Sequence, residues 1–253
     1  MLISTSKAVA LAMAMGTINA FPTPMGMSPN DNTELIADLI TTPTQIKRYQ
    51  KILTDPSGNK LLSGDKLTSA TIWDFEQNGD TIPGGQGGHA SSANLETFPY
   101  LVKSGVTMTL GQLGPCGVFL PHVHPRANEF FVVTEGEVDF GTKLELGLFK
   151  DLSPNPEIGG KLTKNKGTLF PMGSIHYQVN NSPDCKPATI YATLTSEDAG
   201  STPALMDPLP EGVTVGEGMR KRVDAGSFES IRAVTPLHIA KVIDECIARC
   251  HVS

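Results

Sequence analysis

Short segments rich in β-branched and aromatic residues follow one another between Tyr100 and Thr195, and no other feature of this 253-residue chain constrains its fold as strongly. Glycine, proline, asparagine or aspartate separates them at intervals of roughly 8–12 residues, a spacing typical of a β-sandwich or β-barrel. The segments expected to be strands are 106–110, 118–124, 130–134, 137–140, 144–149, 175–179 and 189–195, with a hairpin turn at 135–136. The sequence therefore predicts an all-β domain.

The segments that flank this region have different patterns. Two short helices are expected at 34–40, capped by Asp31 or Asn32, and at 45–53, followed by a strand at 69–75. After Pro236, apolar residues recur at helical spacing, which predicts an amphipathic helix near the end of the chain. The predicted divisions are an N-terminal arm at 21–64, a barrel at 65–200 and a C-terminal extension with its helix at 201–253.

Residues 1–20 resemble a secretory signal peptide. A positive charge at Lys7 precedes an apolar run at 8–15, and the small residue Ala20 offers a cleavage site. A buried N-terminal helix is the alternative, but Pro22 and Pro24 would stop such a helix. We therefore expect a secreted, extracellular protein. Because that environment is oxidising, the cysteines are disulfide candidates, namely Cys116, Cys185, Cys246 and Cys250.

Charge and hydropathy exclude two classes of partner. The 20 Lys and Arg residues against 26 Asp and Glu residues leave a net charge of −6, without a basic run. Nucleic acid is therefore not an expected partner, since phosphate binding depends on clustered basic residues. No apolar stretch of the sequence approaches the roughly 20 residues that a bilayer span requires, so a membrane is not expected either.

Four residues in and beside the predicted strands point to a metal site. His122 and His124 leave the same face of one strand, Glu129 begins the next, and His176 begins a distant one. Each residue alone has an ordinary explanation, since a His-x-His pair is weak evidence, Glu129 could be a surface charge and His176 a core histidine. Together they predict a shared metal ion, because buried imidazoles need hydrogen bonds or a ligand.

The donor set predicts the kind of metal site. Three neutral nitrogens and one carboxylate suit a divalent first-row metal and leave coordination positions open, unlike a closed cysteine-rich zinc site. Gln178 and Asn180 share the strand face of His176, so they are candidates for hydrogen bonds around the metal.

Two motifs resemble the paired signatures of the cupin superfamily. The first runs from Gly117 to Glu129 as Gly-Val-Phe-Leu-Pro-His-Val-His-Pro-Arg-Ala-Asn-Glu, and the second from Pro171 to Asn180 as Pro-Met-Gly-Ser-Ile-His-Tyr-Gln-Val-Asn. The Pro-His-x-His-Pro-Arg-Ala form is similar to that of germins and germin-like proteins. The flanks of these motifs, with the terminal Cys-x-x-x-Cys, resemble the spherulin type found in fungi and slime moulds. The resemblance covers residues 65–200 well.

This resemblance implies a single cupin jelly-roll β-barrel in a secreted protein that forms homo-oligomers. It also implies that manganese binds His122, His124, Glu129 and His176. Two positions depart from the family pattern, since Cys116 and Asn165 stand where the signatures usually open with glycine. Asparagine tolerates a positive φ, so the turn at Asn165 is expected to survive. The long segment 137–166 between the motifs is expected to reshape the barrel mouth.

The cysteine pairing has two alternatives in this barrel. Cys116 precedes the first-motif strand and Cys185 follows the second, so these two could pair and leave Cys246 to pair with Cys250. Alternatively, both tail cysteines link to the barrel. The sequence does not choose between them.

Two functions share this predicted site. The first is a manganese-dependent oxidoreductase that acts on a small anionic substrate, oxalate or superoxide. The second is a non-catalytic metal-binding structural protein of a wall, spore or cyst coat. A two-barrel oxalate decarboxylase is excluded, because the remaining histidines cannot build a second site.

Overall fold

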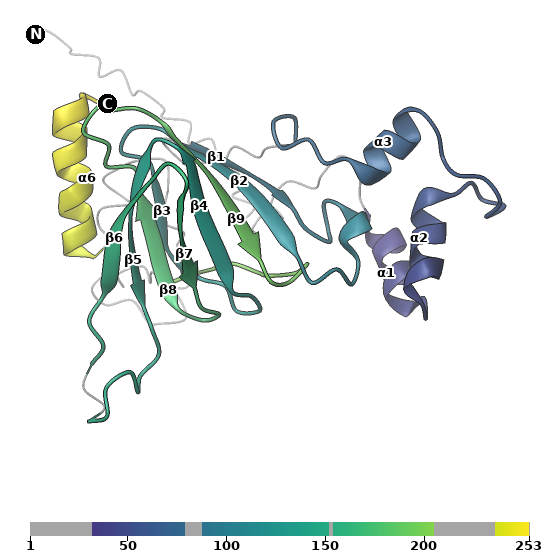
Figure 1. The fold of residues 1–253 in the computed structure, drawn as a ribbon, viewed down its shortest axis with the longest axis horizontal. Helices are drawn as coiled ribbons and strands as arrows, with labels where there is room; N and C mark the ends of the chain where they lie inside the picture. The colour runs from purple at the N-terminus through teal and green to yellow at the C-terminus, as the bar shows by residue number, and fades with distance from the viewer. Residues whose placement is uncertain (1–31, 79–87, 152–153, 205–235, 253) are drawn as a thin grey trace, which may run out of the picture. The chain divides into compact units, whose positions relative to one another are not determined.

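The computed structural model describes residues 32–78, 88–151, 154–204 and 236–252, so the predicted signal peptide lies outside the described residues. The strands form two five-stranded antiparallel sheets that face each other (Figure 1). One sheet has the order β1-β2-β9-β4-β7 and the other β10-β3-β8-β5-β6. The strands are β1 Gly88–Ala93, β2 Thr107–Leu113, β3 Val118–Val123, β4 Glu129–Glu135, β5 Glu137–Lys143, β6 Ile158–Thr163, β7 Lys166–Phe170, β8 Ile175–Val179, β9 Ala188–Leu194 and β10 Thr202–Pro203.

The core lies between the two sheets because apolar side chains alternate along the central strands. In β4 and β9 every second residue is buried, which places one face of each strand inside the barrel. Phe131 and Val133 from one sheet meet Val138 and Leu162 from the other in a single apolar cluster. This packing confirms the predicted all-β jelly-roll, and Phe131 and Val133 share the inward face of Glu129.

Gly136 carries the chain from one sheet to the other, so the predicted hairpin turn is wrong. β4 pairs with β7 and β9, whereas β5 pairs with β6 and β8. Gly136 has a φ of +72°, and a Cβ there would lie 2.6 Å from the carbonyl oxygen of Pro187. Alternation in the sequence reports which face is buried, but not which strand lies alongside.

Two of the predicted strands, 69–75 and 144–149, are not strands in the structure. Residues 69–71 are the last residues of helix α3 (Asp65–Thr71), and residues 72–75 follow it without forming a strand. Ala70 packs on an apolar cluster, while Ile72 is exposed. Residues 144–149 form a loop with Leu146 exposed. The carbonyl groups of Leu144 and Glu145 accept hydrogen bonds from the side-chain amide of Asn155 instead of from a neighbouring strand.

The predicted helices are confirmed. Helices α1 (Thr33–Thr41) and α2 (Gln45–Leu53) share an apolar cluster with the 3-10 turn η1 (Pro99–Leu101), centred on Leu39, Ile52 and Val102. Asn32 precedes α1, but its side chain donates a hydrogen bond to the carbonyl oxygen of Glu96 (2.9 Å) and does not cap the helix. Among the described residues, no helix is both long and apolar enough for a membrane crossing.

Helix α6 (Leu237–Cys250) is fastened to the sheet that contains β8. Ile239 and Ile243 pack on Val179 of β8, and Val118 of β3 belongs to the same apolar cluster. Two disulfides join Cys116 to Cys246 and Cys185 to Cys250. The structure therefore forms the tail-to-barrel pairs, and not the Cys116–Cys185 and Cys246–Cys250 pairs, because the helix brings its last two turns beside both barrel loops.

Candidate metal centre

The barrel brings the four predicted ligands together. His122 lies in β3 and His124 directly follows it, while Glu129 begins β4 and His176 lies in β8. One donor atom from each lies within 4.8 Å of the others. β3 and β8 are neighbours, with His122 opposite His176, whereas β4 belongs to the other sheet. The centre therefore lies between the sheets, with imidazoles on one side and a carboxylate on the other.

The centre is mostly buried and has an aromatic wall. His176 is 1% exposed and Glu129 5%, while His122 and His124 are partly buried. Phe170 stacks on the ring of His176 with 4.4 Å between centroids and 7° between planes. This contact holds the imidazole in one orientation and excludes water from its face.

Each of the three histidines is oriented by a backbone carbonyl group at its Nδ1. The distance from Nδ1 to the carbonyl oxygen is 2.7 Å for His122 and Leu120, and 2.9 Å for His176 and Ser174. For His124 the oxygen belongs to Gly200, at 2.5 Å. Carbonyl oxygens only accept hydrogen bonds, so each Nδ1 carries a proton. In a neutral ring, Nε2 then keeps a lone pair that can bind a metal. Metal-binding histidines have this same second contact.

The remaining nitrogens converge on Glu129. Its Oε2 lies 2.9 Å from Nε2 of His124 and 3.0 Å from Nε2 of His176. With protons on both Nδ1 atoms, these contacts bring lone pairs against a carboxylate, unless a cation or a further proton lies between them. The donor set therefore fits a divalent metal ion.

The pKa values of the cluster reflect two opposing effects, which are burial and the contacts between the ligands. Burial alone would raise the pKa of Glu129. In the metal-free protein, the hydrogen bonds that His124 and His176 donate when Nε2 is also protonated lower this pKa to about 2. Burial acts to lower the pKa of His124, yet the contact with Glu129 outweighs burial and raises that pKa. Burial, followed by the nearby His176, lowers the pKa of His122 to about 4. His122 therefore stays neutral and available as a ligand well below pH 7.

Gln178 and Asn180 differ in their surroundings. Gln178 is 1% exposed, and its Nε2 has no hydrogen-bond partner within the part of the chain that the structure describes. The amide nitrogen of Asn180 is instead occupied by the carbonyl oxygens of Leu113, Gly114 and Lys186. Gln178 thus remains a candidate for contact with a bound ligand, whereas Asn180 holds loops at the opposite end of β8.

The loop at 144–148 and the turn at 171–174 line a hollow of about 410 Å³. The backbone N–H of Gly173, in its wall, donates a hydrogen bond to the carbonyl oxygen of His124 (3.1 Å). Residues 144–148 of the segment 137–166 therefore share a hollow with the turn that is hydrogen-bonded to the backbone of His124. The turn at Asn165 keeps its positive φ of 65°, as predicted, and Cys116 has a φ of 63°.

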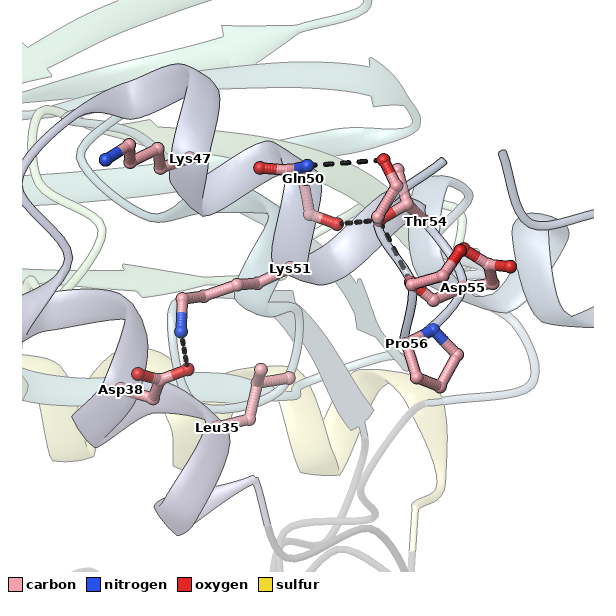
Figure 2. Close-up of a pocket in the computed structure, with 10 residues that line it drawn as sticks. Leu35, Asp38, Lys47, Gln50, Lys51, Thr54, Asp55 and Pro56 are labelled. Carbon is pink, nitrogen blue, oxygen red and sulfur yellow. Dashed lines mark hydrogen bonds and ion pairs between the residues drawn. The ribbon is translucent and has the colours of Figure 1, made fainter. Parts of the chain in front are cut away.

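A second hollow, of about 510 Å³, lies beside α1 and α2 (Figure 2). Its polar groups contact one another, since Lys51 pairs with Asp38 at 2.5 Å and the carboxylate of Asp55 accepts a hydrogen bond from Ser57. None of the predicted site residues lines it, so it is not a candidate centre.

Sequence reasoning missed the three carbonyl groups and the stacked ring of Phe170. Leu120 and Ser174 lie two residues before their histidines, so a local contact could have been anticipated. Gly200 is 76 residues from His124, and no signal in the sequence joins the two.

The chain matches one family model and is similar to several known proteins. The family model described as Cupin matches residues 77–214. The chain is 29% identical to Spherulin-1A of Physarum polycephalum over 223 residues, which are 87% of this chain and 80% of that protein. It is 27% identical to Spherulin-1B of the same organism over 247 residues, 96% of this chain and 90% of that protein. A solved structure of recombinant oxalate oxidase in complex with glycolate is 20% identical and has a TM-score of 0.49, with coverage of 77% of this chain and 87% of that one.

Proposed function

This chain belongs to the cupin family, and we propose that it is a secreted germin-like protein that binds one manganese ion and acts as an oxidoreductase on oxalate or superoxide. His122, His124, Glu129 and His176 would hold the metal. The two tail-to-barrel disulfides support an oxidising, extracellular location.

The observation that carries the metal proposal is the set of three Nδ1–carbonyl contacts. They leave each Nε2 with a lone pair, and two of these atoms lie about 3 Å from the same carboxylate oxygen. A divalent cation would take the place of the protons that hold these contacts together in the metal-free protein, so the contacts would become metal–ligand bonds and Glu129 would neutralise half of the charge of the cation. When bound, manganese supplies a redox-active Lewis acid with open coordination positions.

The residues around the metal would select a small anion. One carboxylate on a dication leaves a net positive charge, which favours an anionic substrate. The amide nitrogen of the inward-facing Gln178 is buried and has no hydrogen-bond partner among the described residues, so it could donate a hydrogen bond to such a ligand or to its water. The stacked ring of Phe170 holds His176 still and keeps water from one side.

The test is to purify the mature protein, quantify its bound metals, and assay hydrogen peroxide release from oxalate and removal of superoxide. We expect about one manganese per chain and one of the two activities. Metal without either activity would contradict the enzyme proposal and support the alternative of a non-catalytic coat protein.

Two variants test the ligands. His122→Ala and His176→Ala are each expected to lose the metal and the activity, because each removes one nitrogen from a four-donor set. His238→Ala is the matched control, since His238 is exposed on α6 and contacts Glu157 instead. Metal retained at full stoichiometry in either ligand variant would show that the ligand assignment is wrong.

A further inference from the structure

The two disulfides lie directly beside each other. Cys246 and Cys250 are bonded to different barrel cysteines, yet their sulfur atoms are only 4.0 Å apart. The sulfur atoms of Cys116, Cys246 and Cys250 all lie within 4.8 Å of one another. We call Cys116, Cys185, Cys246 and Cys250 the sulfur cluster. Two stapling disulfides placed far apart would fasten the helix equally well, so fastening alone does not require this proximity.

The two bonds differ in accessibility. Cys116 and Cys246 are both 0% exposed, so the inner disulfide is shielded from an external thiol. Cys185 and Cys250 are partly exposed. Because exchange requires a thiolate to reach a sulfur atom, an external reductant should attack the outer disulfide first.

We propose that the sulfur cluster is a thiol–disulfide exchange relay that couples the outer disulfide to the inner one. In the first step an external dithiol reduces the Cys185–Cys250 bond, which yields two protein thiols and one oxidised dithiol. In the second step the thiolate of Cys250 attacks the sulfur of Cys246. A Cys246–Cys250 bond forms, the Cys116–Cys246 bond breaks, and Cys116 leaves as a thiolate that takes up the proton released by Cys250. The second step involves no net change in oxidation state.

The geometry of α6 supports the product. Residues four apart in an α-helix have Cα atoms roughly 6 Å apart, within the range that disulfides span. Attack by Cys250 is intramolecular, so it does not depend on an external thiol reaching the buried bond.

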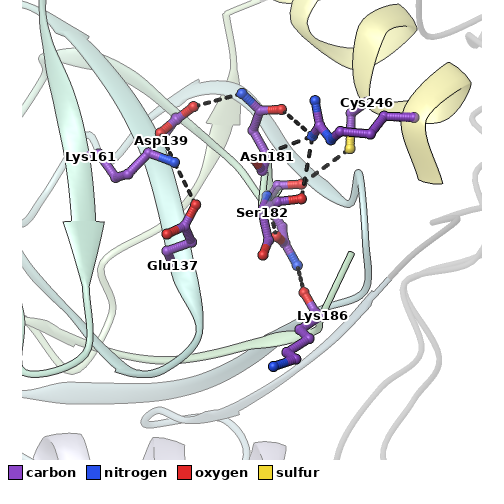
Figure 3. A network of polar contacts seen from close by, with 9 residues as sticks. Glu137, Asp139, Lys161, Asn181, Ser182, Lys186 and Cys246 are labelled. Carbon is purple, nitrogen blue, oxygen red and sulfur yellow. Dashed lines mark hydrogen bonds and ion pairs between the residues drawn. The ribbon is translucent and has the colours of Figure 1, made fainter. Parts of the chain in front are cut away.

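The relay would change how α6 is held. Both covalent links to the barrel would be replaced by one link inside the helix. The remaining contacts include the apolar packing of Ile239 and Ile243 on Val179. They also include the contact of His238 with Glu157, and the hydrogen bond from the Arg249 guanidinium to Oδ1 of Asn181 (2.7 Å), a residue labelled in the network of Figure 3. Reduction of one accessible bond would thus release a helix held by two.

Two single variants form a matched pair for the test. Cys185→Ser and Cys250→Ser each delete the outer disulfide, but only the first leaves the Cys250 thiol beside the inner bond. Each full-length variant is incubated with a mild monothiol and EDTA, quenched with acid, alkylated and mapped by mass spectrometry. The EDTA prevents metal binding by the released thiols.

In Cys185→Ser we expect alkylated Cys116 and a Cys246–Cys250 disulfide, whereas Cys250→Ser should keep the inner bond and be alkylated at Cys185. Labelling of Cys116 should be at least about tenfold greater in the first variant. Equal labelling in the two variants, or an inner bond that stays closed in both, would overturn the relay. If a variant fails to fold, the wild-type protein with limiting dithiol decides. Free Cys116 with free Cys185 supports the relay, and free Cys185 with free Cys250 opposes it.

Discussion

Replacing Glu129 with glutamine should remove the metal response of this protein while preserving the shape of the cluster. Glu129 is 5% exposed, and its Oε2 contacts the Nε2 atoms of His124 and His176 at 2.9 and 3.0 Å. The lowered pKa of Glu129, about 2 against an ordinary 4.5, corresponds to about 3 kcal/mol of folding free energy in the metal-free protein at neutral pH. Because the folded pKa is the lower one, this stabilisation is complete above about pH 4.5 and is lost as the pH falls toward 2.

The assay is thermal unfolding at pH 7, with EDTA and with added Mn²⁺. In EDTA, the free energy of unfolding of Glu129→Gln should be lower than that of the wild type by up to about 3 kcal/mol. With the metal at a hundred times its dissociation constant, the wild type should gain about 2.7 kcal/mol, or about 5–10 °C in Tm. The variant should gain nothing, because its only anionic ligand is gone.

The matched control is Glu157→Gln, which removes another carboxylate that contacts a histidine, His238, at 3.0 Å. This pair is largely exposed, so its loss should cost less than about 1 kcal/mol and leave the metal response intact. A Glu129→Gln variant that responds to Mn²⁺ like the wild type would refute the ligand role. A wild type that ignores Mn²⁺ would instead identify the cluster as a metal-free polar network.

Three further outcomes are expected. Manganese affinity should fall by about tenfold for each pH unit below the raised pKa of His124, because that imidazole must lose a proton to bind the metal. Calorimetry between pH 5 and 8 measures this affinity, and an affinity that does not depend on pH would contradict the coupling. Gln178→Leu should leave the free energy of unfolding within about 1 kcal/mol of the wild type, since the amide nitrogen has no partner among the described residues. The same variant should raise the KM for a small anionic substrate, and an unchanged KM would show that the amide does not contact the substrate. Gly136→Ala should lower the free energy of unfolding, measured in urea, by about 2 kcal/mol or more. Its Cβ would lie 2.6 Å from the Pro187 carbonyl oxygen, and residue 136 would keep an unfavourable φ of +72°. An unchanged free energy of unfolding would show that the backbone relaxes at the sheet crossing.

The six predicted strands that the structure contains are the central ones and share a physical origin. β2, β3, β4, β5, β8 and β9 are each paired on both sides, and burial alternates along β4 and β9. The four strands that were not predicted, β1, β6, β7 and β10, are the sheet edges. Edge strands pair on one side only and carry glycine, lysine and proline, so their sequences resemble loops.

The sequence by itself determined which residues meet in the barrel, because a strand's alternation and the two motifs place His122, Glu129 and His176 on inward faces. Only the tertiary structure decided how they are used. The carbonyl oxygen of Gly200, which sets the proton position on His124, comes from 76 residues away, and the cysteine pairing depends on where α6 docks. Local patterns specify which face of an element is buried, whereas the partner of a hydrogen bond or a disulfide is a property of the assembled fold.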